Sequence, residues 1–190
     1  MTDLADRRGV ETDVYRPAED SALLLRAALD GIESTDLVLD LGTGSGFVGD
    51  RIAMETGATV VASDRNPLAC AAARDRGLPV VRADLVEPFA PETFDVVVFN
   101  PPYLPEDDRG IRDDWMEVAL TGGETGRAVI DPFLRTVDRV LDPEGVVYLL
   151  ASTLSGLDAV RSLAHEAGFV VDELDRESYP FEKLVVWRLE

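Results

Sequence analysis

The sequence is poor in the residues that build disulfides, metal centres and membrane segments. It contains one cysteine, Cys70, and one histidine, His165, so an intrachain disulfide is impossible and no metal site is expected. Cys70 lies in a run of small residues typical of a packed helix, where a buried thiol is expected rather than a nucleophile. No apolar run approaches 18 residues and no basic-then-apolar leader opens the chain. We therefore expect a cytoplasmic protein without a membrane span.

Positive charge is also scarce. The chain has 18 basic against 37 acidic residues, a net charge of −19, and Lys183 is its single lysine. Such a surface ordinarily repels nucleic acid, so nucleic acid is not the expected partner. The acid is spread along the whole chain, as in the proteins of salt-loving archaea. At molar salt the Debye length is only about 3 Å, so the charge is first a sign of habitat and only weakly excludes DNA or RNA.

No repeat, low-complexity tract or linker divides the 190 residues, which predicts one domain over residues 1–190. Strand-like and helix-like patterns alternate from Leu37 onward. Strands are expected at residues 37–41, 59–63, 79–83, 94–99, 145–151, 170–174 and 184–189, and helices at 18–29, 47–56, 67–76, 127–141 and 157–167. Residues 1–36 form an N-terminal helical segment in this interpretation.

The expected strands are apolar on successive residues and are separated by amphipathic helices. This pattern predicts a doubly wound α/β fold with a mostly parallel, seven-stranded sheet and helices on both faces. The last two strands are close enough in sequence to pair antiparallel. Residues 104–124 are too long for a simple connection and rich in charge, so we expect them to form a substrate-side loop.

The tetrapeptide Asn100-Pro101-Pro102-Tyr103 follows the apolar run of residues 94–99. The two prolines hold φ near −65° and place Asn100 rigidly at the carboxyl end of a strand, the edge where open α/β sheets bind ligands. The Asn100 side-chain oxygen and the Pro101 carbonyl can accept from one NH2 group while Tyr103 supplies an aromatic wall. This arrangement predicts alkylation of an amino or amide nitrogen. Taken alone, such a tetrapeptide more often marks a rigid turn. The rest of the sequence decides between a turn and a site that binds an NH2 group.

A glycine-rich turn, Gly42-Thr43-Gly44-Ser45-Gly46, follows the first strand and opens a helix. Glycines allow positive φ and let a ligand lie against bare backbone. Dinucleotide-binding enzymes place Gly-x-Gly-x-x-Gly here, but Phe47 occupies the position of the third glycine.

Two acids follow the next two strands. Asp64 stands where both nicotinamide and adenosylmethionine enzymes hold ribose hydroxyls, and Asp84 can accept from an adenine amino group, which suits adenosylmethionine better. Capping or turn chemistry is the alternative for either acid alone. Two acids at successive strand ends favour binding.

In this order and spacing, these motifs resemble a class I S-adenosylmethionine-dependent methyltransferase of the HemK type, which has a Rossmann-like fold. The resemblance extends to Val14-Tyr15-Arg16-Pro17-Ala18-Glu19-Asp20-Ser21 and to Leu120-Thr121-Gly122-Gly123 with Gly126-Arg127. Only residues 1–36 precede the first strand, so the chain is similar to the short archaeal and eukaryotic branch. That branch methylates the glutamine of the Gly-Gly-Gln loop in class 1 release factors, typically with a small zinc-binding activator subunit.

The resemblance also implies roles for individual residues. Residues at the cofactor would be Tyr15, Glu19, Asp20, Asp40, Gly42, Gly44, Gly46, Asp64, Asp84 and Asn100, and those at the target nitrogen Asn100, Pro101 and Tyr103. Acids such as Glu19 and Asp20 also occur in a first helical turn simply to complement the helix dipole. The strand at residues 79–83 is the expected sheet edge and the expected place for the activator to pair.

Other functions remain open at this point. An N6-adenine methyltransferase would use the same two acceptors on a flipped base, although Arg109, Arg112 and Arg127 offer only an interrupted basic track. A lysine side chain is a further protein target. A nucleotide-binding scaffold without transfer chemistry and a nicotinamide oxidoreductase are less well supported, because Asn100 and the glycines are intact and Phe47 breaks the dinucleotide pattern.

Overall fold

In the computed structural model, the described residues are Val14, 19–106 and 115–190. The strands are β1 (Leu37–Leu41), β2 (Thr59–Asp64), β3 (Val80–Arg82), β4 (Phe94–Phe99), β5 (Leu141–Ser152), β6 (Val171–Tyr179) and β7 (Glu182–Leu189). The α-helices are α1 (Glu19–Leu29), α2 (Phe47–Thr56), α3 (Pro67–Asp75), α4 (Trp115–Leu120), α5 (Ile130–Leu134) and α6 (Leu157–Glu166). Short 3₁₀ turns η2 (Val137–Val140) and η3 (Thr153–Ser155) flank β5.

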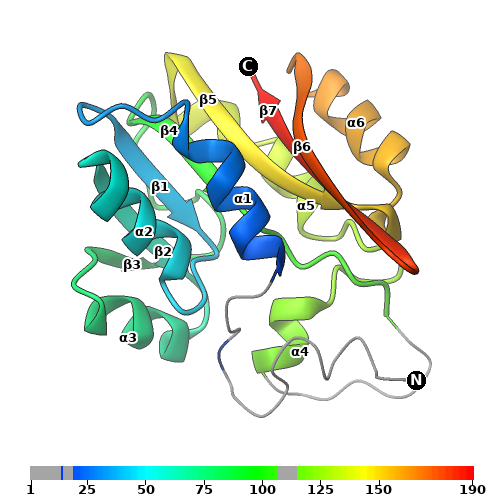
Figure 1. The fold of residues 1–190 in the computed structure, drawn as a ribbon, viewed down its shortest axis with the longest axis horizontal. Coiled ribbons are helices and arrows are strands. Elements are labelled where there is room, and N and C mark those ends of the chain that lie inside the picture. Colours follow the sequence, from blue (N-terminus) through cyan, green and yellow to red (C-terminus); the bar gives the residue numbers. More distant parts are fainter. Residues whose placement is uncertain (1–13, 15–18, 107–114) are drawn as a thin grey trace.

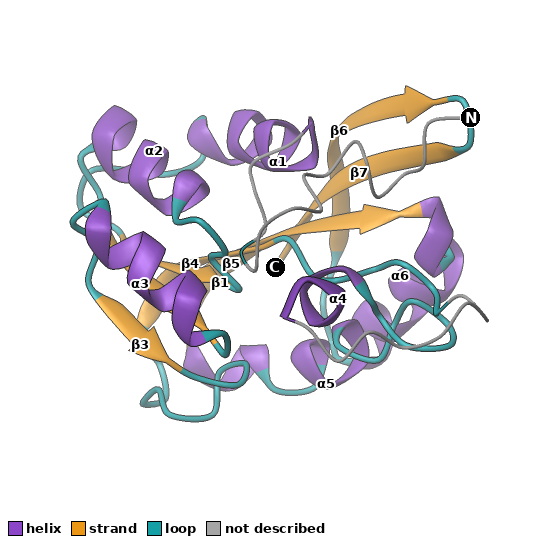
Figure 2. Cartoon of the chain, turned by 90° about the horizontal axis from the view of Figure 1, so that it is seen from below, coloured by secondary structure: helices purple, strands orange, loops and turns teal. Residues whose placement is uncertain are grey.

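The seven strands form one sheet in the order β3-β2-β1-β4-β5-β7-β6 (Figure 1). Strands β1 to β5 are parallel, and β7 runs antiparallel to both β5 and β6. Helices α1, α2 and α3 cover one face of the sheet, and α5 and α6 cover the other (Figure 2). The predicted doubly wound fold, its antiparallel last pair and the edge position of β3 are therefore confirmed.

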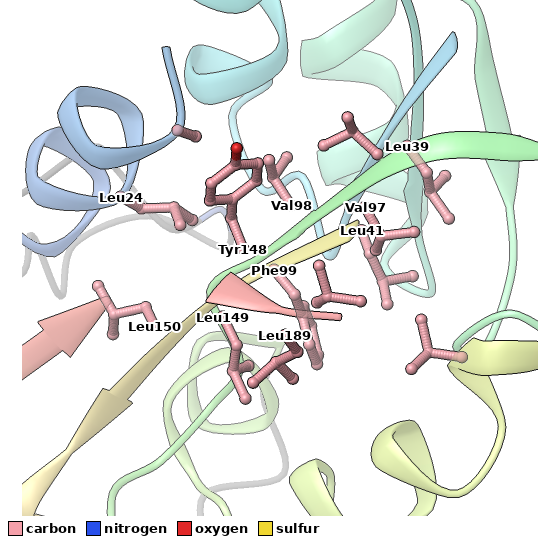
Figure 3. Packing of buried hydrophobic residues seen from close by; sticks show 14 of the residues in the cluster. Leu24, Leu39, Leu41, Val97, Val98, Phe99, Tyr148, Leu149, Leu150 and Leu189 are labelled. Carbon is pink, nitrogen blue, oxygen red and sulfur yellow. The ribbon is translucent and has the colours of Figure 1, made fainter. Parts of the chain in front are cut away.

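The core lies on both faces of the three central strands. Leu39 of β1, Val97 of β4 and Leu149 of β5 are completely buried, and their neighbours along each strand face the opposite layer of helices (Figure 3). This double coverage explains why these strands are apolar on successive residues.

The predicted helix over residues 127–141 is wrong. The chain forms only α5 and η2 there, and β5 begins directly at Leu141. The break falls at Thr136, whose backbone is not helical and whose hydroxyl donates to the carbonyls of Pro132 and Phe133. A threonine that bonds back to the preceding turn competes with helix propagation.

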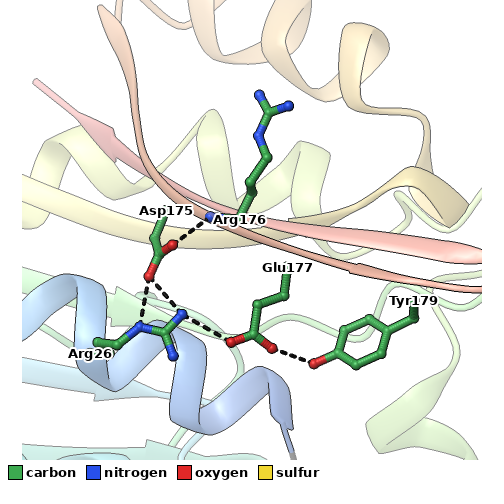
Figure 4. A network of polar contacts seen from close by, with 5 residues as sticks. All are labelled: Arg26, Asp175, Arg176, Glu177 and Tyr179. Atoms are coloured by element: carbon green, nitrogen blue, oxygen red, sulfur yellow. Dashed lines mark hydrogen bonds and ion pairs between the residues drawn. The ribbon is translucent and has the colours of Figure 1, made fainter.

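Strand β6 is longer than the predicted 170–174. Its second half is polar, and its carboxylates hold α1 in place: Arg26 donates to Asp175 at 2.8 Å and to Glu177 at 2.9 Å (Figure 4). Tyr179 donates to the other oxygen of Glu177, and these hydrogen bonds lower the pKa of Glu177. Asp175 and Glu177, which lie beyond the predicted strand, are therefore on the side of an edge strand that faces α1.

Among the helices of the described residues, none has the length and apolar character needed to cross a bilayer.

Gly31 provides a test of core packing, because a β-carbon there would lie 2.0 Å from the Tyr148 hydroxyl oxygen. We predict that Gly31→Ala lowers the free energy of unfolding by about 1–3 kcal/mol through overpacking. In a Tyr148→Phe background the same substitution should cost less, because the clashing oxygen is gone. Urea denaturation of the two single variants and the double variant measures this coupling. An equal cost in both backgrounds would show that Tyr148 does not restrict position 31.

Candidate functional site

The candidate site is a cavity at the carboxyl ends of β1, β2, β3 and β4. The sheet order places β1 between β2 and β4, so this edge is the switch point at which doubly wound folds bind ligands. The space between its walls, including open solvent at its mouth, amounts to about 1220 Å³. Its principal lining residues are Asp20, Asp40, Gly42, Gly44, Asp64, Asp84, Leu85, Asn100, Pro101, Tyr103, Trp115 and Leu120.

The glycine turn brings bare backbone to the cavity floor. Gly42 and Gly44 have φ values of 62° and 54°, which residues with a β-carbon rarely adopt. A β-carbon on Gly42 would also lie 3.2 Å from the Phe99 ring. Gly46, assigned to the cofactor from the sequence, does not line the cavity. A β-carbon there would lie 2.8 Å from the Ala73 α-carbon, so Gly46 allows close contact between the start of α2 and α3.

Asp40 is a buried carboxyl that holds this turn against the central strand. Its Oδ2 accepts hydrogen bonds from the Thr43 hydroxyl and, at 3.0 Å, from the Gly49 amide. Burial raises the pKa of Asp40 to about 6, although the two hydrogen bonds oppose the shift. Gly49 was missed from the sequence: a β-carbon there would lie 2.8 Å from Asp40 Oδ2. A glycine within an expected helix was the only local signal.

Asp64 connects the glycine turn to the end of β2. Its Oδ2 accepts from the Gly44 amide at 3.0 Å and its Oδ1 from the Asn66 amide at 2.8 Å. Burial raises the pKa of Asp64. Asp84 is exposed and lines the same cavity. The two acids predicted from successive strand ends therefore lie in one cavity.

The Asn-Pro-Pro-Tyr segment forms the next part of the wall. Asn100, Pro101 and Tyr103 all line the cavity, and Tyr103 is buried. Within the described part of the chain, the side-chain amide of Asn100 has no hydrogen-bond partner. Its oxygen is therefore available, beside the Pro101 carbonyl, to accept from a ligand NH2 group.

Of the three residues near the N-terminus that were assigned to the cofactor, one lines the cavity, one does not and one lies outside the described residues. Asp20 is buried in the first turn of α1 and lines the cavity, and its Oδ2 lies 3.5 Å from the Tyr103 hydroxyl. Its Oδ1 accepts from the Ser21 amide at 2.7 Å. Glu19 is exposed and does not line the cavity. Tyr15 lies outside the described residues.

Helix α4 forms the wall beyond Tyr103 and was not predicted, because residues 104–124 were expected to be a loop. Trp115, Ala119 and Leu120 line the cavity from this helix. Their spacing at i, i+4 and i+5 was the available signal for one apolar helical face. Residues 104–124 were thus correctly predicted to lie beside the site, as far as their described part shows, but residues 115–120 form a helix and not a loop.

Both the sequence and the structure match known methyltransferases. The model of the methyltransferase small domain matches residues 17–117. Human methyltransferase HEMK2 is 33% identical, with 85% of this chain and 87% of the relative covered. A protein of Methanocaldococcus jannaschii, whose name includes N5-glutamine methyltransferase, is 35% identical over 93% of both chains.

A solved structure extends the match to the whole fold. It is the E. cuniculi Mtq2-Trm112 complex, described as responsible for methylation of the termination factor eRF1, with 34% identity and a TM-score of 0.77. The match covers 94% of this chain and 99% of that chain. Ribosomal protein L11 methylase from Lactobacillus delbrueckii shares the fold alone, at 15% identity and a TM-score of 0.68.

The cavity suits the cofactor of these enzymes, because two carboxylates at successive strand ends and a bare glycine turn face one space. The chain therefore belongs to the methyltransferase small-domain family, as an S-adenosylmethionine-dependent enzyme of the HemK type.

Proposed function

We propose that this chain methylates the side-chain amide nitrogen of the glutamine in the Gly-Gly-Gln loop of a class 1 release factor. The observation that carries the proposal is the Asn100 amide, which has no hydrogen bond to any described residue and faces the same cavity as Asp64 and Asp84. Relatives support the choice of acceptor: a Clostridium acetobutylicum protein, 30% identical over 93% of this chain and 68% of its own length, is named release factor glutamine methyltransferase.

S-adenosylmethionine, when bound, supplies an electrophilic methyl group on sulfur. We place its ribose hydroxyls at Asp64 and its adenine amino group at Asp84, since these carboxylates line the cavity beside the glycine turn. Asp40 keeps the turn in position through Thr43 and Gly49.

Asn100 and Pro101 act on the acceptor by orienting it. An amide nitrogen is a poor nucleophile because its lone pair is delocalised. If the Asn100 side-chain oxygen and the Pro101 carbonyl accept its two N–H bonds, the lone pair points towards the methyl group. Preorganised dipoles also meet the positive charge that develops on nitrogen, an effect of roughly 3 kcal/mol per group. The nitrogen would gain the methyl group as the carbon–sulfur bond breaks, and its surplus proton would pass to solvent.

The adenine alternative needs positive charge for phosphates near the cavity. Of the three arginines considered for this purpose, only Arg127 lies in the described residues. Its guanidinium donates to the carbonyls of Ser155 and Thr125, so it holds the chain together instead of facing a ligand. Arg127 is therefore removed from the candidate phosphate contacts of the adenine alternative.

We further propose that a small zinc-binding activator pairs with the free edge of β3. The E. cuniculi relative was solved as a complex with Trm112, which supports a small activator partner. Strand β3 is the last strand on its side of the sheet. Ala62 donates to the Pro79 carbonyl and Ala83 to the Asp64 carbonyl, so the alternation of a strand directs the Val80 N–H group outward, while the Val80 carbonyl accepts from Arg74 at 3.4 Å. An apolar edge strand with outward backbone groups is suited to β-augmentation.

The first prediction from the proposed function concerns cofactor binding. Asp64→Ala should weaken S-adenosylmethionine by about 1.5–3 kcal/mol, roughly tenfold or more in Kd, because the ribose hydroxyls lose a charged acceptor. Calorimetry measures the effect, with Asp75→Ala at the far end of α3 as a control that does not line the cavity. Unchanged affinity in the Asp64 variant would contradict the assignment, as would tight NAD binding without any response to S-adenosylmethionine.

The second prediction concerns methyl transfer. Asn100→Ala should abolish methylation of the release factor while reducing cofactor affinity far less, because its oxygen mainly orients the acceptor. Mass spectrometry of the tryptic peptide detects the added methyl group, and a release factor with its Gly-Gly-Gln glutamine replaced is the control. Retained turnover in the variant would remove Asn100 from the mechanism. Methylated adenine in DNA, with an unmodified release factor, would favour the adenine alternative.

The third prediction concerns the activator. Val80→Pro removes an outward-facing N–H group from β3 and should abolish co-purification with the activator, because Pro cannot donate to an added strand. Light scattering should show aggregation or poor solubility of the wild-type chain produced alone. Met54→Ala, at an exposed position of α2, is the matched control and should keep the partner. A well-behaved, fully active monomer would contradict the proposal.

A further inference from the structure

The Asn-Pro-Pro-Tyr segment is held from behind by residues 120–127, which we call the glycine clasp. Leu104 donates its amide to the Leu120 carbonyl at 3.0 Å, and the Gly122 amide donates to the Leu104 carbonyl at 2.8 Å. These bonds form an isolated parallel bridge between Leu104 and Thr121. The residue directly after Tyr103 is therefore fixed to a segment that begins 16 positions later in the chain.

The clasp leaves no space for side chains where it meets this segment. A β-carbon on Gly126 would lie 2.5 Å from the Tyr103 carbonyl oxygen, and one on Gly122 would lie 2.5 Å from the Gly126 carbonyl carbon. Both glycines are buried, and Gly126 has a φ of 70°. The position of the Tyr103 carbonyl is thus set by direct backbone contact.

The clasp is in turn anchored to the sheet. Arg127 donates to the Ser155 carbonyl and, at 3.1 Å, to that of Thr125. The Ser155 hydroxyl donates to the Ser152 carbonyl at 2.8 Å, and the Ser152 hydroxyl donates to Glu182 at 2.8 Å. These three residues are buried: Ser155 ends η3, Ser152 ends β5 and Glu182 begins β7. A continuous chain of contacts therefore runs from the sheet to Tyr103.

We propose that Gly126 and Arg127 are positioning residues for methyl transfer, which place Asn100 and Pro101 through the Tyr103 carbonyl. This inference rests on the proposed function. Neither residue lines the cavity, so both lie outside the proposed site. The two prolines stiffen the segment but fix only its own dihedral angles. The clasp supplies the second fixed point, and the strand end of β4 supplies the first.

The separation of the two halves of the site predicts a specific kinetic signature. The proposed cofactor acids follow β2 and β3, whereas the backbone hydrogen bonds of the clasp go to Leu104 and Glu106 after β4, and Arg127 anchors it to Ser155 after β5. Loosening the clasp should lower kcat for release-factor methylation by roughly tenfold to 100-fold, since small misplacements of an orienting group are costly. The Kd for S-adenosylmethionine should stay unchanged.

The test compares Gly126→Ala with Gly168→Ala in the chain co-purified with its activator. Both glycines have positive φ, 70° and 98°, so both substitutions carry the same kind of backbone strain. A β-carbon at Gly168 meets nothing within 4 Å, whereas at Gly126 it meets the Tyr103 carbonyl. We expect the loss of kcat only in the Gly126 variant. Equal kcat in the two folded variants would overturn the proposal.

Arg127→Gln removes the anchor of the clasp to Ser155 without introducing a steric clash. This variant tests the proposal if the Gly126 variant does not fold. It should lower kcat in the same way at constant cofactor Kd. Amide hydrogen exchange of Leu104 and Gly122 gives a readout independent of activity: exchange should accelerate in both clasp variants and not in Gly168→Ala. Unchanged exchange, or faster exchange with full kcat, would overturn the proposal. If the wild-type chain binds S-adenosylmethionine but methylates no release factor, the proposed function fails, and amide exchange alone still tests the clasp.

Discussion

The Asp40 carboxyl joins the central strand, the glycine turn and helix α2 at one buried point. Burying a carboxylate is unfavourable, and this cost appears as a pKa raised from 3.8 to about 6. The native state therefore binds a proton more tightly than the unfolded chain, and the contribution of Asp40 to stability falls as the pH rises from 3.8 to about 6. In return, the Asp40 carboxylate fixes the position of the glycine turn. By accepting from Thr43 and Gly49, it holds the turn so that the Gly44 amide reaches Asp64 on the next strand.

The parallel part of the sheet was predictable because each strand is indicated by a short apolar run and by the residues that end it. Strands β1 and β4 have the predicted bounds, since each is an apolar run ended by glycine or proline. Parallel strands bring their carboxyl ends to one edge, whatever the helices between them do, so Asp64, Asp84 and Asn100 could be placed together from sequence order alone. The helices were less predictable where tertiary contacts override propensity. The back-bonded Thr136 ends α5, and α4 forms within a charged segment that reads as a loop.

Contacts between distant residues were not predictable from local patterns. Tyr103 and Asp20 are 83 positions apart, and nothing near either residue indicates the other. The same holds for glycines. Gly49 and Gly126 are required by what approaches them, Asp40 and the Tyr103 carbonyl, and a sequence shows only that a side chain is missing. For Gly46 the motif predicted contact with a ligand, but the structure places this glycine against α3.

In the proposed function, the cavity separates recognition of the cofactor from recognition of the acceptor. The acids and the glycine turn belong to β1, β2 and β3, while Asn100 and Pro101 follow β4 and α4 closes the far side. A side-chain oxygen and a backbone carbonyl recognise an NH2 group and not the molecule that carries it. Discrimination between a glutamine and an adenine must therefore come from the walls around this pair. Those walls include Trp115 and Leu120, on the helix that local patterns did not reveal. The type of reaction is accordingly easier to predict from this sequence than the acceptor, because recognition of the acceptor depends on tertiary structure.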